Sequence, residues 1–330
     1  MPPRTATEEE KRDIDNNLEN FPILYKLIKN NPKRYITLSN PFEKDISYRF
    51  PGRNSSRDQF RTDSSVCEIG YLLLHSEVNG TKQYLDLVES IFFRYPSIQN
   101  KYADKLCENF FRTLSEIKVY DRLCNAGFTP DIEFPITTPS SRHDEPSNSD
   151  FSIIYEGRRY FLEVKHRGAA YQDELAHSGL PARYPQTGFV NPETGECANQ
   201  QYDQNKTENM IVDAIDRQIS KWATSNYATV PVILMIEVSY DILGMSYNID
   251  FNRVNRRVTI PPNFAGVFLF AFYPRERSYP EKIHWYPILR FPHRYSRCPL
   301  CTRSPRCRPH DLVPLSLYRR LEASFRDPSP

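Results

Sequence analysis

Apolar residues recur at helical spacing in four segments of the chain. These segments are predicted to be amphipathic helices, and they cover residues 8–28, 82–95, 100–125 and 206–224. In the third segment, Leu106, Phe110 and Leu114 fall on one face of a helix. Gly127 comes directly after this segment and is the predicted helix stop.

Shorter apolar or alternating runs predict strands between and after these helices. They cover residues 128–136, 150–155, 158–166, 230–240, 266–273 and 282–291. The polar stretch 137–149 is predicted to be a loop, and the long polar insertion 169–205 a mobile flap. The order helix, three strands, helix, strand is typical of an α/β fold with a mixed sheet flanked by helices.

Composition narrows the class of protein. The chain of 330 residues is 39% hydrophobic and 25% charged, which is typical of a globular protein. No apolar run approaches the roughly 18–20 residues of a membrane helix, and the N-terminus is polar, so no membrane association and no signal peptide are expected. With an odd count of 7 cysteines, the expected location is intracellular: cytoplasmic, or nuclear in a eukaryote.

Charge is unevenly distributed along the chain. Lys and Arg number 43 against 41 acids, a net charge of +2, so the whole molecule is not an obvious polyanion binder. The stretch from Arg290 to Arg320, however, is rich in Arg and contains only one acid, Asp311. Such a cluster either contacts nucleic-acid phosphates or forms a solvated basic face.

The segment 150–166 is predicted to be a β-hairpin with a distinctive polar face. If Glu156 and Gly157 form a two-residue turn, Asp150 lies directly across from Glu163. The other face is apolar or aromatic, apart from one Arg beside the turn, and is expected to be core. Two opposed carboxylates lie roughly 5 Å apart at Cβ, which is destabilising unless something neutralises them.

A divalent cation is the natural neutraliser of this acid pair, because Mg²⁺ prefers oxygen ligands. Lys165 follows Glu163 by two residues and therefore points to the same face. A carboxylate pair, a Mg²⁺ or Mn²⁺ ion and an adjacent lysine are the equipment for hydrolysing a phosphodiester. The alternative is a surface hairpin on which Lys165 forms salt bridges with both acids, but these strands are too apolar for an exposed hairpin.

Two helical residues join this candidate site. Glu116 falls at the border of the apolar stripe of its helix, where a side chain can reach the rim of the sheet. Gln218 is a polar residue on the core-facing stripe of the later helix. It either faces the site or is a core glutamine that hydrogen-bonds to backbone.

The sequences SEIKVYDRLCNAGF, SDF and FLEVK, in this order and spacing, resemble the PD-(D/E)XK nuclease superfamily, which has the restriction-endonuclease-like fold. The resemblance covers roughly residues 100–240. It implies that Asp150 and Glu163 bind the metal together with the backbone carbonyl of Val164, and that Lys165 is the catalytic lysine. It also implies that Glu116 holds a second metal or a metal-bound water. Ser149 stands where the family has proline.

A second motif, RCPLCTRSPRCRPH, has zinc-ligand spacing. Cys298 and Cys301 form a C-x2-C pair, and Cys307 with His310 forms a second close pair, which together predict a compact Cys₃His zinc knuckle. His293 is an alternative fourth ligand. The competing interpretation is three reduced cysteines in a loop rich in Arg and Pro. A zinc knuckle here would present basic side chains to a nucleic-acid backbone.

Together these patterns predict three regions: a helical N-terminal region (1–97), a nuclease-like core (98–292) and a basic zinc-binding C-terminal segment (293–330). The expected function is metal-dependent endonucleolytic cleavage of DNA. A homodimer is the natural assembly if both strands are cut, because that usually needs two active sites. The alternatives are an inactive nucleic-acid-binding or scaffold protein with this fold, and an RNA nuclease.

Overall fold

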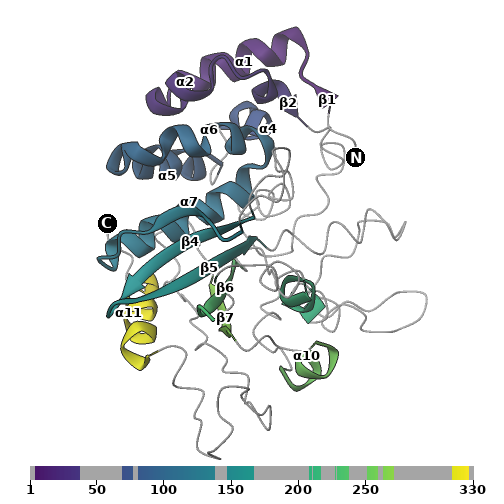
Figure 1. Cartoon of the computed structure of the whole chain (residues 1–330). Coiled ribbons are helices and arrows are strands. Elements are labelled where there is room, and N and C mark those ends of the chain that lie inside the picture. The colour runs from purple at the N-terminus through teal and green to yellow at the C-terminus, as the bar shows by residue number, and fades with distance from the viewer. Residues whose placement is uncertain are drawn as a thin grey trace, which may run out of the picture.

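The fold was analysed in a computed structural model. It describes residues 4–37, 69–76, 81–137, 147–166, 208–209, 211–216, 227, 229–237, 251–258, 263–270 and 314–326. The expected strand 282–291 and insertion 169–205 lie outside these residues, as does most of the expected helix 206–224. Figure 1 shows layers of N-terminal helices stacked above a long helix, α7, which in turn lies on a twisted sheet.

The N-terminal region is helical, as expected. Its elements are β1 (Arg4–Thr5), α1 (Glu8–Leu18), α2 (Pro22–Ile28), the 3-10 helix η1 (Pro32–Tyr35), β2 (Ile36–Thr37), α4 (Ile69–Leu74), α5 (Thr81–Arg94), the 3-10 helix η3 (Pro96–Ile98) and α6 (Gln99–Glu108). The expected single helix 8–28 is divided into α1 and α2, with Pro22 in the first turn of α2. Proline is favoured there because its missing N–H would have no helical partner.

The predicted helix 100–125 is likewise two helices, α6 and α7 (Phe110–Asn125). They are divided at Asn109, whose extended backbone leaves the helix while its side chain accepts a hydrogen bond from the Arg112 N–H at 3.0 Å. This is a side-chain N-cap, which favours a new helix start. The expected stop at Gly127 is confirmed, because this residue has φ +77° and its N–H donates to the Cys124 carbonyl.

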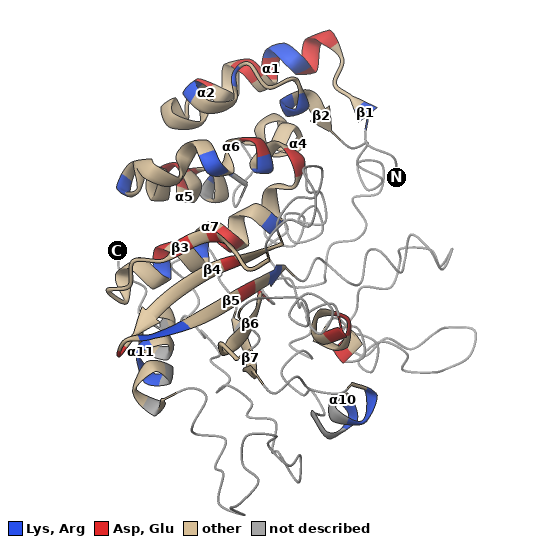
Figure 2. Cartoon of the chain, viewed as in Figure 1, with Lys and Arg blue, Asp and Glu red and all other residues tan. Residues whose placement is uncertain are grey.

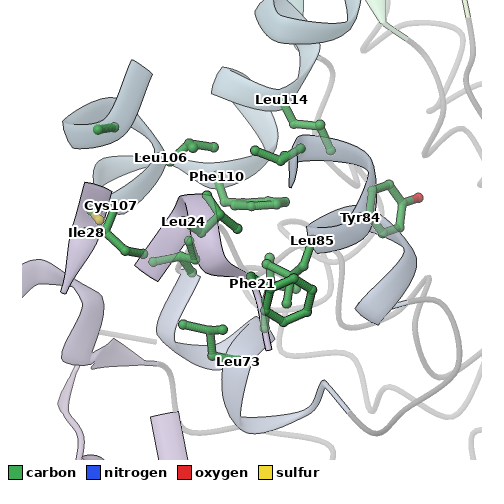
Figure 3. Close-up of a cluster of buried hydrophobic side chains, with 14 of the residues drawn as sticks. Phe21, Leu24, Ile28, Leu73, Tyr84, Leu85, Leu106, Cys107, Phe110 and Leu114 are labelled. Atoms are coloured by element: carbon green, nitrogen blue, oxygen red, sulfur yellow. The ribbon is translucent and has the colours of Figure 1, made fainter. Parts of the chain in front are cut away.

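One hydrophobic core holds the N-terminal helices together. Figure 3 shows side chains from α2, α4, α5 and α6 converging with Phe110 and Leu114 of α7. Phe21, Leu24 and Phe110 are at most 2% exposed. Because the first half of α7 belongs to this core, the helical region fixes the position of α7 relative to the sheet.

Within the described residues the sheet has five strands, β3 (Asp131–Pro135), β4 (Asn148–Tyr155), β5 (Arg158–His166), β6 (Val232–Glu237) and β7 (Phe264–Phe270), in that spatial order. The pairs β3–β4 and β4–β5 are antiparallel, and β5–β6 and β6–β7 are parallel. The prediction of an α/β fold with a mixed sheet is therefore confirmed. The predicted turn is present too: Glu156 and Gly157 both have positive φ, and Phe151 pairs with Leu162 in the expected register.

One face of the sheet packs against α7 and α11 (Leu315–Arg326). The predicted apolar face of the hairpin belongs to this core, in which Phe151 and Leu162 are fully buried. The helix α11 was not predicted, and its Leu317, Leu321 and Phe325 complete the core from the C-terminal segment. A further short helix, α10 (Phe251–Arg257), follows β6. None of the helices within the described residues is long and apolar enough to cross a membrane.

Candidate active site at one end of the β4–β5 hairpin

The candidate site begins where the pairing of β4 with β5 ends. The last paired residues are Phe151 and Leu162. Beyond them, the Val164 N–H donates to the Asp150 carboxylate at 2.7 Å. The Ser149 hydroxyl turns back to donate to the carbonyl oxygens of Phe151 (2.9 Å) and Leu162 (3.3 Å). Side chains thus replace the backbone ladder at this point, and Asp150 is fixed against β5.

Lys165 lies between the two predicted carboxylates. Its Nζ is 4.0 Å from Asp150 Oδ2 and 3.9 Å from Glu163 Oε2. The structure therefore brings Asp150, Glu163 and Lys165 together on one face, as the hairpin register predicts. Glu163 is 1% exposed, whereas Asp150 and Lys165 are partly open to solvent. Figure 2 shows acidic and basic stretches of α7, β4 and β5 meeting at this end of the sheet.

Glu116 reaches the same site from α7. Its side chain is buried, and the Lys105 ammonium lies 3.6 Å from its Oε2. Burial, and after it the nearby charge of Asp150, raise the pKa of Glu116 to about 7, against the lowering effect of Lys105, Arg112 and Lys165. Glu116 therefore exchanges its proton near neutral pH.

Glu133, which no sequence motif singled out, adds another carboxylate to this end of the sheet. The pairs Ile132–Phe151 and Phe134–Ser149 place Glu133 opposite Asp150 in the β3–β4 register. Its φ of 52° is left-handed, a conformation that is unfavourable for a glutamate.

The carboxylate of Glu133 binds two lysines of α6. Its oxygens lie 3.1 Å from Lys101 Nζ and 2.5 Å from Lys105 Nζ. Lys101 and Lys105 are four residues apart and therefore lie on one face of α6. The acid with which they pair depends on how α6 packs in the fold, which the spacing does not predict.

Tyr102 also belongs to this end of the sheet. It is fully buried, and its hydroxyl has no hydrogen-bond partner among the described residues. Burial raises the pKa of Tyr102 well above its usual value, and the negative charges of Glu116, Asp150 and Glu133 raise it further. The Tyr102 side chain is thus close enough to these three carboxylates to respond to them.

A second polar cluster supports the site from the core side of the sheet. Lys118 of α7 binds Glu237 of β6 at 2.9 Å, and both are almost fully buried. Ser115 donates to the other oxygen of Glu237 and lies 3.1 Å from His166 Nδ1. His166 thus points to the opposite face from Lys165, as expected from strand alternation.

The surroundings shift the pKa values of Glu237 and Lys118 for different reasons. Burial alone would raise the pKa of Glu237, but the charge of Lys118, the hydrogen bond from Ser115 and the nearby His166, whose Nδ1 lies 3.8 Å from Oε2, hold it well below its usual range. Burial lowers the pKa of Lys118, and the attraction of Glu237 only partly offsets that effect. This cluster joins α7 to the ends of β5 and β6. Two of its residues, Ser115 and His166, are the sequence neighbours of Glu116 and Lys165.

The donor atoms of the site suit a hard cation. Asp150 and Glu163 offer carboxylate oxygens, and oxygen is what Mg²⁺ and Mn²⁺ prefer. The N–H and C=O of one strand residue point to the same side, so the Val164 carbonyl points toward Asp150, as its N–H does. Within the described residues, no three His, Cys, Asp or Glu side chains form a metal-binding group by themselves. A bound ion would therefore combine the two carboxylates with the backbone oxygen and with water or substrate.

The remaining predicted site residues cannot be placed. Gln218 and the predicted zinc ligands Cys298, Cys301, Cys307 and His310 lie outside the described residues, so those predictions stand as they were. Comparison of the chain with protein-family models, with curated proteins and with solved structures finds no match.

Proposed function

We propose that this chain is a metal-dependent nuclease, with a restriction-endonuclease-like core, that hydrolyses phosphodiester bonds of DNA. The observation that carries the proposal is the position of Lys165, within 4.0 Å of the Asp150 and Glu163 carboxylates at the end of the paired hairpin. The order of the elements supports it as well. The helix α7 precedes three antiparallel strands, of which β4 carries Asp150 and β5 carries Glu163 and Lys165, and β6 then pairs with β5 in parallel.

The spacing of these groups argues against a purely structural salt bridge. A charge-assisted N–H···O bond is normally 2.7–2.9 Å long. Lys118 and Glu237 in the same molecule meet at 2.9 Å. Lys165 instead stays 4.0 Å and 3.9 Å from its two acids, beyond hydrogen-bond distance of either. At this spacing the Lys165 ammonium donates a hydrogen bond to neither acid and can donate to a bound ligand.

Each residue then has a defined role. Asp150, Glu163 and the Val164 carbonyl would hold Mg²⁺ or Mn²⁺, which polarises the phosphate and lowers the pKa of water when it is bound. Asp150 is oriented for this by the Val164 N–H. The Lys165 ammonium would donate to a phosphate oxygen and stabilise the charge that develops as the water oxygen attacks phosphorus and the P–O bond to the leaving group breaks.

Glu116 is suited to act as a general acid or base in this reaction. A general acid or base works best when its pKa lies near the working pH, and the pKa of Glu116 is about 7. The ionised form would accept a proton from the attacking water or orient that water. The burial and the neighbouring Asp150 charge that raise this pKa are therefore part of the proposed catalytic arrangement.

The predicted partners follow from this chemistry. The Arg-rich C-terminal segment would contact the DNA backbone and carry the zinc knuckle. Cleavage of both strands usually needs two active sites, so a homodimer is the expected assembly, and the odd number of cysteines favours an intracellular location.

The proposal is tested by incubating purified protein with plasmid, linear and branched DNA and with RNA, in Mg²⁺, in Mn²⁺ and in EDTA. We expect divalent-ion-dependent cleavage of DNA that is lost in Lys165→Ala, while DNA binding is retained, because the lysine acts on the transition state. Cleavage of RNA alone would shift the substrate class. Binding without cleavage under every condition would contradict the proposal and favour an inactive nucleic-acid-binding protein.

A further inference from the structure

We propose that the Lys105 ammonium acts as a built-in cation in place of a second divalent ion, so that each chain binds one catalytic metal. This inference rests on the proposed function, because it concerns the same carboxylate site. Of the two roles expected for Glu116, it departs from that of holding a second metal and keeps that of holding a metal-bound water.

The position of Lys105 is the first step of the argument. Its Nζ lies 3.6 Å from Glu116 Oε2 and 2.5 Å from Glu133 Oε1. It also experiences the charge of Asp150. A second ion bridging Glu116 and Asp150 would have to occupy the space around this ammonium group or displace it.

The backbone of Glu133 shows that Lys105 is held in place. A non-glycine residue in the left-handed region is strained and persists only where its surroundings enforce it. Glu133 lies opposite Asp150 in the β3–β4 register, where two carboxylates would repel each other. With φ at 52°, its carboxylate instead pairs with Lys101 and Lys105. The strained residue therefore anchors Lys105 beside Glu116.

The charge of the site fits one divalent ion better than two. Four carboxylates, those of Glu116, Asp150, Glu133 and Glu163, meet three ammonium groups, those of Lys101, Lys105 and Lys165. With every acid ionised, these seven groups carry a single net negative charge, and the Arg112 guanidinium, whose charge also acts on Glu116, cancels it. One divalent ion then gives the site a net charge of +2, which suits a phosphodiester. A second ion would leave an excess of positive charge beside three lysines.

The buried Tyr102 hydroxyl is a further polar group at this corner of the site. It lies one helical turn before Lys105, fully buried and without a hydrogen-bond partner among the described residues. A buried hydroxyl of this kind is normally paired with protein or water. Together with the Lys105 ammonium, it gives this edge of the site donors suited to a water or a phosphate oxygen.

The test is the Mn²⁺ stoichiometry of the full chain, measured by isothermal titration and by the electron paramagnetic resonance signal of free Mn²⁺. Only ions whose binding is lost in Asp150→Asn are counted, which excludes the cysteine segment. We expect one such ion per chain in the wild type, two in Lys105→Gln and one in Lys105→Arg, which keeps the charge. Circular dichroism verifies that each variant is folded.

The outcomes separate this inference from the proposed function. Two ions in the wild type would overturn the role of Lys105 and leave the nuclease proposal intact. One ion in both the wild type and a folded Lys105→Gln would also overturn it, because the lysine would then exclude nothing. No ion in the wild type would contradict the inference and the proposed function together.

Discussion

Replacing Glu116 by glutamine should stabilise the metal-free protein at alkaline pH. The pKa of this carboxyl rises from 4.5 to about 7 in the folded chain, mainly because the side chain is buried and secondly because Asp150 is near. Each tenfold change in proton affinity corresponds to about 1.4 kcal/mol, so ionising folded Glu116 costs on the order of 3 kcal/mol.

The sign of the effect follows from which state holds the proton. Between pH 4.5 and about 7, folded Glu116 keeps its proton while the unfolded chain has released it. The wild type therefore loses stability as the pH rises through this window, and the loss is complete above pH 7. Glutamine cannot ionise, so Glu116→Gln should match the wild type at pH 4.5 and exceed it by about 3 kcal/mol at pH 8.

The assay is urea unfolding in EDTA at pH 4.5 and pH 8, with the free energy of unfolding extrapolated to water. Glu9→Gln is the matched control, because Glu9 is an exposed glutamate of α1. We expect the control to track the wild type at both pH values. An equal stability difference for Glu116→Gln at both pH values, or a loss of stability at pH 8, would refute the electrostatic reasoning. Cleavage by Glu116→Gln should nevertheless fall, because the proton-exchanging group is gone.

Three further predictions concern other parts of the chain. Lys118→Met should destabilise the fold by about 3–5 kcal/mol in urea unfolding, because it leaves Glu237 charged and buried without its ammonium partner; a change below about 1 kcal/mol would contradict this. Glu133→Gly should stay within about 1 kcal/mol of the wild type, because glycine relieves the left-handed backbone while the ion pairs are lost, whereas Glu133→Val should be clearly less stable. Protein purified without added zinc should contain one Zn²⁺ per chain that is lost in a Cys298→Ser, Cys301→Ser double variant, and metal analysis that finds none would leave these cysteines without a metal role.

Local sequence rules were sufficient for the hairpin that carries the motif. A two-residue turn ending in glycine fixes the register, and strand alternation then assigns every side chain between Asp150 and Lys165 to a face. For this reason the pairing of Phe151 with Leu162 and the grouping of Asp150, Glu163 and Lys165 followed from the sequence.

The residues that complete the site depend on tertiary packing. Lys105 and Tyr102 reach it because α6 packs across the first turns of α7, and the sequence does not define that packing angle. Glu133 reaches Lys105 only through a left-handed backbone, which propensity rules assign to glycine or asparagine. The helix break at Asn109 had a local explanation, its side-chain cap, but the continuous apolar stripe concealed it.

If Asp150, Glu163 and Lys165 form a divalent-metal phosphodiesterase site, the rate of plasmid cleavage must depend on both Mg²⁺ and the Glu163 carboxylate. The initial rate of supercoiled plasmid cleavage is measured for the wild type, Glu163→Gln and Glu156→Gln across a Mg²⁺ titration. Glu156 lies in the turn of the same hairpin, far along β5 from Lys165, and controls for changes to the hairpin itself. We expect Mg²⁺-dependent cleavage by the wild type and Glu156→Gln, and a loss of at least about 100-fold in Glu163→Gln, as for removal of a group that acts on the transition state. Equal rates for Glu163→Gln and the wild type would show that these three residues are not the site of cleavage.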